Sequence, residues 1–458
     1  MSHSASYSGI HPDDTIVAVS TPPGRGGIGI VRLSGTQAIE ITEQLVRRSA
    51  ATPAPPRKSL LAELLDDDGN VVDEVLFTVF RGPKSYTAED VVEISCHGSP
   101  AILAFGVERA IRLGARLAEP GEFTQRAFLN GRIDLSQAEA VRDLIDATTI
   151  YQARIALQQA RGALAKRLAA SKQQLCDLIA LLEAGIDFAE DDIDVASWEQ
   201  LLERLDPIQA DAQRLVESYR YGKVVHGGIT LAILGRPNVG KSSLFNRLLE
   251  RERAIVTPQA GTTRDAVSEV CSIEGLPVQL IDTAGIRSTT DVAEIQGVER
   301  SYQALADADV VLVVIDLSEP TDSTDQQLLT EARERGKSLI VGNKADIALG
   351  EKAVIDVRVS AVTGEGIDDL RRKIQERVVP ASGVEEEAGW ITNLRHETLL
   401  KESLGSLRQA RYAIENDIPH EMLLLDLYAA LRSFDQITGA TTVDDILANI
   451  FSRFCIGK

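Results

Sequence analysis

The spacing of hydrophobic and polar positions changes several times along the chain, which has 458 residues. Up to about residue 130, short apolar runs alternate with segments of helical spacing. The runs predict strands at Thr15–Ser20, Val71–Phe80 and Val91–Ser95, and the helical spacing predicts helices at Thr36–Arg47 and Pro100–Leu113. Such alternation is typical of an α/β domain, so we expect one here.

From about residue 134 the pattern becomes helical. Leu175, Leu178 and Leu182 recur at the spacing of one helix face, and Ser136 with Glu139 has the form of a capping box. Helical spacing continues to about residue 221 and returns after residue 390. Because the C-terminal helices cannot bury their apolar faces alone, we expect them to pack on the first helical segment, with an inserted domain between the two.

These changes predict a multidomain fold with four segments. Gly227-Gly228 marks the change to the inserted domain, and Pro380–Gly389 has the composition of a linker. The predicted segments are an α/β domain at residues 1–130, the first part of a helical domain at 131–221, an inserted α/β domain at 222–380, and the second part of the helical domain at 381–458.

Composition and charge exclude several classes of function. The net charge of −20 argues against broad, sequence-independent binding to nucleic acid, which depends on clustered Lys and Arg. No run approaches the roughly 20 apolar residues of a membrane span, and the polar start lacks the features of a secretory signal, so we expect a cytoplasmic protein. The cysteines are scattered, which argues against a zinc site or a disulfide framework, and we expect Cys96, Cys176 and Cys271 to be buried.

The most specific motif is Gly235–Ser243, which fits the phosphate-binding pattern GxxxxGK[S/T]. It follows the apolar run Ile229–Leu234 and precedes helical spacing, so the strand, loop and helix that this motif requires are all expected. Backbone N–H groups of such a loop cradle phosphates at the helix N-terminus. We expect Lys241 to reach the β- and γ-phosphates and Ser242 to bind Mg²⁺. The nucleotide contacts predicted from this loop are Asn238, Val239, Gly240, Lys241, Ser242 and Ser243.

Further nucleotide motifs follow in a fixed order. Asp282, at the end of an expected strand, suits the metal side of a phosphate site, and Thr263 lies where a threonine can close over Mg²⁺ and the γ-phosphate. Asp346 can accept hydrogen bonds from N1 and N2 of guanine, which adenine cannot offer. The predicted contacts are Thr262, Thr263, Asp282, Thr283, Ala284, Gly285, Asn343, Lys344, Asp346, Ser360 and Ala361. This order predicts a GTP site, and the segment resembles the G domain of translation-factor-related GTPases.

Motifs near both ends of the chain resemble one family. Thr21–Gly27, Pro120–Val141 and the C-terminal Phe454–Lys458 look like those of the bacterial MnmE (TrmE) family of tRNA modification GTPases, and the resemblance covers essentially the whole chain. It implies a homodimer whose N-terminal domain binds a formyl-tetrahydrofolate and whose helical domain carries the G domain as an insertion. It also implies a flavin-dependent partner, MnmG (GidA), that forms a heterotetramer with it. Together they would install an aminomethyl or carboxymethylaminomethyl group on C5 of the wobble uridine, position 34, of certain tRNAs.

The resemblance also assigns a folate site. It implies that Arg32, Glu93, Arg132 and Lys458 contact 5-formyl-tetrahydrofolate or a related folate. Cations suit the carboxylates of the glutamate tail, and an acid suits the N–H groups of the pterin ring. Family members often carry lysine where this chain has Arg132, which keeps the charge but changes the geometry of the contact.

The catalytic residues of the nucleotide site also depend on the resemblance. Ile286 stands where Ras-like proteins carry the glutamine that orients the attacking water, so another group must stabilise the transition state. The resemblance implies a K⁺ ion that binds against the phosphates when two G domains meet. Asn238 would be its side-chain ligand, and backbone carbonyls of residues 257–262 would complete the shell. The K⁺ ligands implied are Asn238, Thr257, Gln259 and Thr262.

Three further residues receive roles from the same resemblance. Glu294 would position the attacking water through a second water, and Arg264 would be a supporting residue of the same switch region. Cys455 has two interpretations: a packed residue near the C-terminus, or a reactive thiol in the tRNA-modification site.

Two other functions are open on the sequence. A regulatory GTPase switch in ribosome assembly would share the G domain, but one of the Era type would carry a GxxG loop between helices, whereas Gly24–Gly27 precedes an expected strand. A folate-binding module with a decayed GTPase is opposed by the intact Lys241, Asp282 and Asp346.

Overall fold

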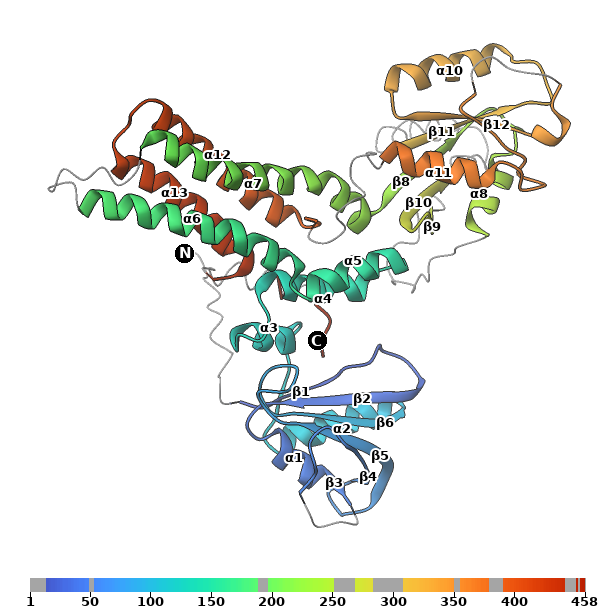
Figure 1. The fold of residues 1–458 in the computed structure, drawn as a ribbon. Helices are drawn as coiled ribbons and strands as arrows, with labels where there is room; N and C mark the ends of the chain where they lie inside the picture. Colours follow the sequence, from blue (N-terminus) through green and yellow to red (C-terminus); the bar gives the residue numbers. More distant parts are fainter. Residues whose placement is uncertain are drawn as a thin grey trace, which may run out of the picture. The chain divides into compact units, whose positions relative to one another are not determined.

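The computed structural model describes residues 14–48, 53–187, 197–250, 268–282, 308–349, 355–378, 390–440, 450–451 and 454–457. The chain divides into two compact units, one formed by residues 1–142 with 438–458 and the other by residues 143–437 (Figure 1). Within the described ranges, none of the helices combines the length and apolar character that crossing a membrane requires.

The first unit is built on a seven-stranded sheet with the order β3-β4-β5-β6-β2-β1-β7. Neighbouring strands are antiparallel, except that β1 and β7 run parallel. Helices α1 (Ala38–Leu45) and α2 (Pro100–Arg112) pack on one face of this sheet (Figure 1). The strands are β1 (Ile16–Val19), β2 (Gly26–Ser34), β3 (Val46–Arg47), β4 (Ser59–Leu65), β5 (Val71–Phe80), β6 (Val91–Gly98) and β7 (Arg116–Leu117).

The strand register of this sheet decides which polar side chains meet. Val31 and Leu33 of β2 enter the core with Val92 and Ile94 of β6. Because side chains alternate along a strand, the residues between them project from the opposite face, away from the two helices. Arg32 lies directly opposite Glu93 in the register of β2 and β6, so the two side chains meet on that face.

The described C-terminal residues pack with the first unit. Phe451 and Phe454 form one apolar cluster with Leu135, and Phe128 packs against it. This cluster joins α3 (Glu122–Leu129) and α4 (Leu135–Asp146) to the end of the chain. The predicted domain boundaries stay predictions, but this packing groups residues 438–458 with the N-terminal unit, whereas the helical spacing places them in the second helical part.

The start of α4 differs from the predicted capping box. Oδ1 of Asp134 accepts a hydrogen bond from the backbone N–H of Gln137 at 2.9 Å, and Oε1 of Gln137 accepts one from the N–H of Asp134 at 3.0 Å. The reciprocal box therefore begins at Asp134, two residues before Ser136. Ser136 donates its hydroxyl to Asp134 at 2.6 Å, so it supports the cap without being the cap.

The second unit contains a helical part with an inserted sheet domain. Long helices α6 and α7 share one apolar core with α12 and α13, although about 165 residues of chain separate the two pairs. Leu175, Leu178 and Leu182 of α6 enter this core, in agreement with their spacing. The predicted combination of an α/β part, a helical part and an inserted α/β domain is confirmed. The helices are α5 (Ile150–Ala160), α6 (Ala163–Asp187), α7 (Trp198–Gly227), α12 (Leu394–Glu415) and α13 (His420–Thr438).

The inserted domain is a six-stranded sheet with the order β13-β12-β11-β8-β10-β9. All neighbours are parallel except β9 and β10, so the carboxyl ends of β8, β10, β11 and β12 meet at one edge. Ligands of open α/β sheets bind at this edge. The strands are β8 (Ile229–Leu234), β9 (Ser268–Ile273), β10 (Leu276–Asp282), β11 (Val310–Asp316), β12 (Ser338–Asn343) and β13 (Val357–Arg358); the helices are α8 (Lys241–Leu249), α10 (Ser323–Arg335), η3 (Ala345–Ile347) and α11 (Ile367–Val378).

The cysteines follow the expected pattern in part. Cys96 and Cys271 are buried, as predicted, and burial together with the charge of Asp73 raises the pKa of the Cys96 thiol to about 12. Cys176 is only partly buried, because it lies toward the edge of the α6 face that enters the helical core. Cys455 is exposed.

Candidate functional sites

The phosphate-binding loop connects β8 to α8 through an unusual backbone. Gly235, Asn238 and Gly240 have φ angles of 153°, 65° and 92°, a region that glycine adopts freely and asparagine tolerates better than most residues. A Cβ added at Gly240 would lie 2.3 Å from Nδ2 of Asn343, so no larger residue fits there. The loop therefore ends at the N-terminus of α8. Backbone N–H groups at this position can bind phosphate.

Lys241 and the two serines stand at the start of α8. Nζ of Lys241 donates hydrogen bonds to the backbone oxygens of Gly235 and Arg236, each at 2.8 Å. The ammonium group is thus held against the phosphate-binding loop itself. Ser242 and Ser243 are exposed in the first turn of α8, where a hydroxyl can reach a metal ion beside the phosphates.

Asn343 joins the phosphate-binding loop to residues 360–363, the base loop, which is predicted to contact the guanine base. Its Nδ2 donates to the backbone oxygen of Val239 at 2.8 Å, and its Oδ1 accepts from the N–H of Ala361 at 3.0 Å. The side chain is buried, so each of these hydrogen bonds contributes roughly 1 kcal/mol and would cost more if left unmade. The Asn343 amide therefore connects its own motif, Asn343–Asp346, with the phosphate-binding loop and with Ser360–Ala361.

Lys344 and Asp346 lie just beyond β12. Lys344 has a φ of 64°, and its Nζ forms an ion pair with Oδ2 of Asp316 at 2.5 Å. Burial would raise the pKa of Asp316, but hydrogen bonds from Lys344 and Ser318 outweigh it and the pKa is lowered. Asp346 is exposed in η3, at the same edge of the sheet. That its carboxylate binds a guanine base stays a prediction from the motif.

The base loop is held by the predicted residue Ser360 and by Arg247, which the sequence pattern does not mark. The hydroxyl of the buried Ser360 accepts a hydrogen bond from the N–H of Thr363 at 3.1 Å. Arg247 of α8 donates from Nε to the oxygen of Ala361 at 2.9 Å and from Nη2 to the oxygen of Val362 at 2.5 Å. No local pattern marks Arg247, because its partners lie far along the chain.

The phosphate loop also has an acidic anchor that the sequence pattern does not predict. Arg236 forms ion pairs with Glu319 and Asp322 at 2.9 Å each and with the buried Asp325 at 3.5 Å. These acids belong to the start of α10 and the segment before it, and Asp322 with Asp325 is the capping box of that helix. The helix start thereby fixes the outer side of the loop.

Several predicted contacts lie outside the described residues. They are Thr257, Gln259, Thr262, Thr263, Arg264, Thr283, Ala284, Gly285 and Glu294. The backbone of Asp282 is described: it ends β10 and pairs with Ile233 of β8, one residue before the end of that strand. The strand end therefore lies beside the phosphate loop, where the motif requires it.

A separate cavity of about 470 Å³ lies in the first unit and brings three predicted residues together. Arg32, Glu93 and Arg132 all line it, with Tyr86. Arg32 donates from Nε and Nη2 to Oε1 of Glu93 at 3.0 and 2.8 Å. The guanidinium groups of Arg32 and Arg132 each lie 5.6 Å from the centre of the Tyr86 ring, at a distance that allows a cation–π contact.

The C-terminal tail reaches the same cavity. The backbone oxygen of Gly457 accepts hydrogen bonds from Nη1 of Arg32 at 3.1 Å and from the hydroxyl of Ser20 at 2.9 Å. Lys458 follows directly in the chain but lies outside the described residues. Three of the four predicted folate contacts are thus placed together, and the neighbour of the fourth contacts one of them.

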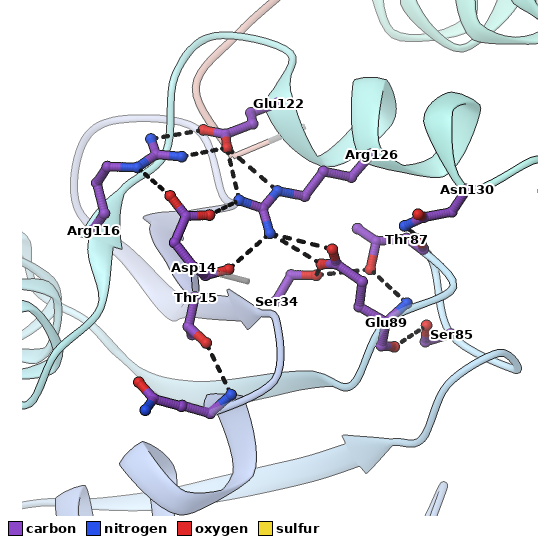
Figure 2. Close-up of polar contacts among 11 residues, drawn as sticks. Asp14, Thr15, Ser34, Ser85, Thr87, Glu89, Arg116, Glu122, Arg126 and Asn130 are labelled. Carbon is purple, nitrogen blue, oxygen red and sulfur yellow. Dashed lines mark hydrogen bonds and ion pairs between the residues drawn. The ribbon is translucent and has the colours of Figure 1, made fainter. Parts of the chain in front are cut away.

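A buried ion network supports the turn that follows the cavity residues Ser85 and Tyr86 (Figure 2). Arg126 of α3 is 2% exposed and pairs with Asp14, with Glu89 at 3.2 Å and with Glu122 at 3.0 Å. Two of these acids belong to separate stretches of chain, so the arginine ties α3 to the strand β1 and to the turn before β6. Removing Arg126 would break the ion pair with the partly buried Glu89, whereas Asp14 and Glu122 would keep their ion pairs with Arg116, so we expect a loss of stability centred on the turn that carries Glu89.

The network continues through Ser34 to Thr87, the neighbour of the cavity residue Tyr86. Ser34 donates to Glu89 at 2.7 Å and shares a hydrogen bond with Thr87 at 2.7 Å (Figure 2). Asn130, at the end of α3, donates to the oxygen of Thr87 at 2.7 Å. These bonds fix the turn that carries Tyr86 against the segment that carries Arg132.

Comparison with known proteins bears on both sites. The family model described as "MnmE helical domain" matches residues 135–455, and the one described as "GTP-binding protein TrmE N-terminus" matches residues 15–132. The chain belongs to the MnmE family. Similar relatives named tRNA modification GTPase MnmE occur in Koribacter versatilis (53% identical), Carboxydothermus hydrogenoformans (44%) and Aquifex aeolicus (43%). Each match covers 97% of this chain and 99%, 100% and 100% of the respective relative.

Membership of the MnmE family agrees with the geometry of the nucleotide site. The phosphate loop, Asn343 and the base loop form one connected arrangement at the carboxyl edge of a parallel sheet. The chain is a GTP hydrolase, as predicted. The roles of the individual residues in both sites remain predictions.

Proposed function

We propose that this protein couples GTP hydrolysis to the modification of C5 of the wobble uridine, position 34, in certain tRNAs. It would act in the cytoplasm as a homodimer, in a heterotetramer with a flavin-dependent MnmG (GidA) partner, and add an aminomethyl or carboxymethylaminomethyl group. One observation carries the proposal: a connected GTP-type site and a cation-rich cavity occur in a single chain that matches MnmE relatives over 97% of its length.

In the nucleotide site, this chain's residues would bind and orient GTP. Lys241 would exchange its two backbone contacts for the β- and γ-phosphates, and Ser242 and Thr263 would hold Mg²⁺. Asp346 would select guanine by accepting two hydrogen bonds from the base. Asn343 would keep the phosphate loop and the base loop in register with each other.

The hydrolytic step lacks the glutamine of Ras-like proteins, since Ile286 stands in its place. Asn238 is exposed on the phosphate loop, where its amide oxygen suits a hard cation such as K⁺. A bound K⁺ would supply positive charge to the transferring phosphoryl group, in the role of an arginine finger. Glu294 would position the attacking water, so Glu294→Ala should leave GTP binding intact and slow turnover.

In the N-terminal cavity, the residues present fit a formyl-tetrahydrofolate. The Glu93 carboxylate can accept from pterin N–H groups, and Arg32 and Arg132 supply positive charge for carboxylates. Tyr86 offers an aromatic surface between the two arginines. Burial raises the pKa of its phenol, although both arginines act in the opposite direction, so the phenol stays neutral at physiological pH.

Reconstitution of the reaction tests the proposal. The full chain would be combined with MnmG, flavin, NADH, GTP, a one-carbon folate and tRNA, and the wobble nucleoside would be analysed by mass spectrometry. We expect modified uridine that depends on GTP and is lost with Lys241→Ala. A chain that hydrolyses GTP with this partner present, yet leaves the uridine unchanged and co-sediments with ribosomal particles, would instead be an assembly switch.

A further inference from the structure

The cavity in the first unit carries more positive charge than the predicted folate contacts use. Besides Arg32 and Arg132, its lining includes Arg57 and Lys84, whereas Glu93 is the one acid among the lining residues. The chain as a whole has a net charge of −20, so a local excess of cations runs against its overall balance. A concave, cation-rich surface on an acidic protein indicates an anionic ligand.

The charges in this cavity are arranged by depth. Arg32 is 14% exposed and is neutralised by Glu93, with which it forms an ion pair at 2.8 Å. Arg57, Lys84 and Arg132 are exposed at the rim. Within the described ranges, no carboxylate lies at ion-pair distance from any of these three. Described carboxylates of the protein therefore do not neutralise the positive charges of Arg57, Lys84 and Arg132 at the rim.

Arg57, one of the rim cations, is held in place by backbone contacts. Nη2 of Arg57 donates to the backbone oxygen of Lys84 at 2.9 Å, so the two residues are tied side by side. The N–H of Arg57 donates to the oxygen of Val79 at 2.7 Å, which fixes the segment to the end of β5. Because the Arg57 guanidinium is ordered before binding, less conformational entropy is lost when an anionic ligand binds it.

We infer that Arg57 and Lys84 form a subsite for a γ-linked oligoglutamate tail, and that the protein selects polyglutamylated over monoglutamylated folate. This inference rests on the proposed folate site, in which Glu93 receives the pterin ring and the tail points to the rim. A monoglutamate tail has two carboxylates, and each added γ-linked glutamate brings one more. Three rim cations exceed what one glutamate can neutralise, and a longer tail supplies the missing charge.

The test measures binding of 5-formyl-tetrahydrofolate with one and with three glutamates to the full chain by calorimetry. Two exposed ion pairs at about 0.7 kcal/mol each predict that the triglutamate binds about tenfold tighter. In Arg57→Ala/Lys84→Ala this ratio should fall to about one. Lys58→Ala/Arg81→Ala removes the same charge from exposed neighbours outside the cavity lining and should keep the ratio.

The outcomes separate this inference from the folate proposal. If neither folate binds, the folate site itself is refuted, and the tail subsite with it. If both folates bind equally to the wild type, or if the double variant keeps the preference, only the tail subsite is refuted. The preference should also shrink as salt is raised, because exposed pairs are screened. Thermal unfolding of each variant shows that a lost ratio does not reflect lost folding.

Discussion

Arg247 allows a quantitative test of how the base loop of the GTP site is held. Its side chain reaches from α8 to two consecutive backbone oxygens, those of Ala361 and Val362. It also forms an ion pair with Glu250 at 2.8 Å, at the end of the same helix. Since Ser360 and Ala361 are predicted to close over the guanine base, releasing Arg247 should remove part of the support of this loop, and nucleotide binding would have to supply the lost order.

The expected magnitude follows from the contacts. A hydrogen bond that involves a charged group contributes about 1.5–3 kcal/mol. The Arg247 side chain is 32% exposed, so we take about half of the lower value for each bond, or about 1.5 kcal/mol for both. If this free energy must be recovered when GDP or GTP binds, Arg247→Ala should weaken nucleotide binding about tenfold.

Titration of a fluorescent GDP analogue measures this affinity, with Glu250→Ala as the matched control. That variant removes the ion pair of Arg247 and keeps its two bonds to the base loop, so its affinity should stay within about twofold of wild type. Unchanged affinity in Arg247→Ala, or an equal loss in Glu250→Ala, would refute the assignment. Unfolding by urea identifies any variant whose loss of binding reflects loss of folding.

Three further predictions concern other parts of the molecule. Turnover of GTP should be higher in KCl than in NaCl at matched ionic strength, and Asn238→Ala should lose this difference; equal rates in both salts for the wild type would make Asn238 structural. The lowered pKa of Asp316 means that its pairing with Lys344 stabilises the fold above the ordinary pKa near 3.8 and is lost as pH falls through the lower folded value. Asp316→Asn should therefore reduce the free energy of unfolding at pH 7 and flatten its fall in acid, as urea titrations at several pH values can show. Asp134→Ala should destabilise the first unit by about 1 kcal/mol and Ser136→Ala by less, and the reverse order in thermal unfolding would favour a capping box that begins at Ser136.

Much of the fold could be predicted because its signals are local. The strand Val71–Phe80 has the predicted limits, since turn residues before it and alternating burial along it mark its ends. The core positions of α6 follow from helical spacing alone. The predicted cap of α4 is wrong by two residues because Asp134 and Ser136 both suit a helix start, and only the backbone geometry decides between them.

The candidate sites divide in the same way. The phosphate loop is one contiguous turn whose glycines and lysine must occupy fixed positions, so the amino-acid sequence is enough to recognise its residues. The contact of Arg247 with Ala361 spans 114 positions and has no sequence pattern. Nor could composition show that Arg57 and Lys84 share a cavity with Arg32, because the three belong to different stretches of chain.

The sequence by itself determined much of the local geometry of this protein: most of the predicted helices and strands, where the backbone needs glycine, and which motif can cradle phosphates. Those properties depend on residues within one or two turns of one another. The predicted helix at Thr36–Arg47 is shorter, because Val46–Arg47 pairs with β4 as strand β3. The tertiary structure alone decided that Arg32 stands opposite Glu93, that Asn343 joins two loops, and that the C-terminal aromatic residues pack on α3 and α4. Such contacts depend on strand register and on the packing of distant segments. They form only when burial of the hydrophobic core brings these segments together.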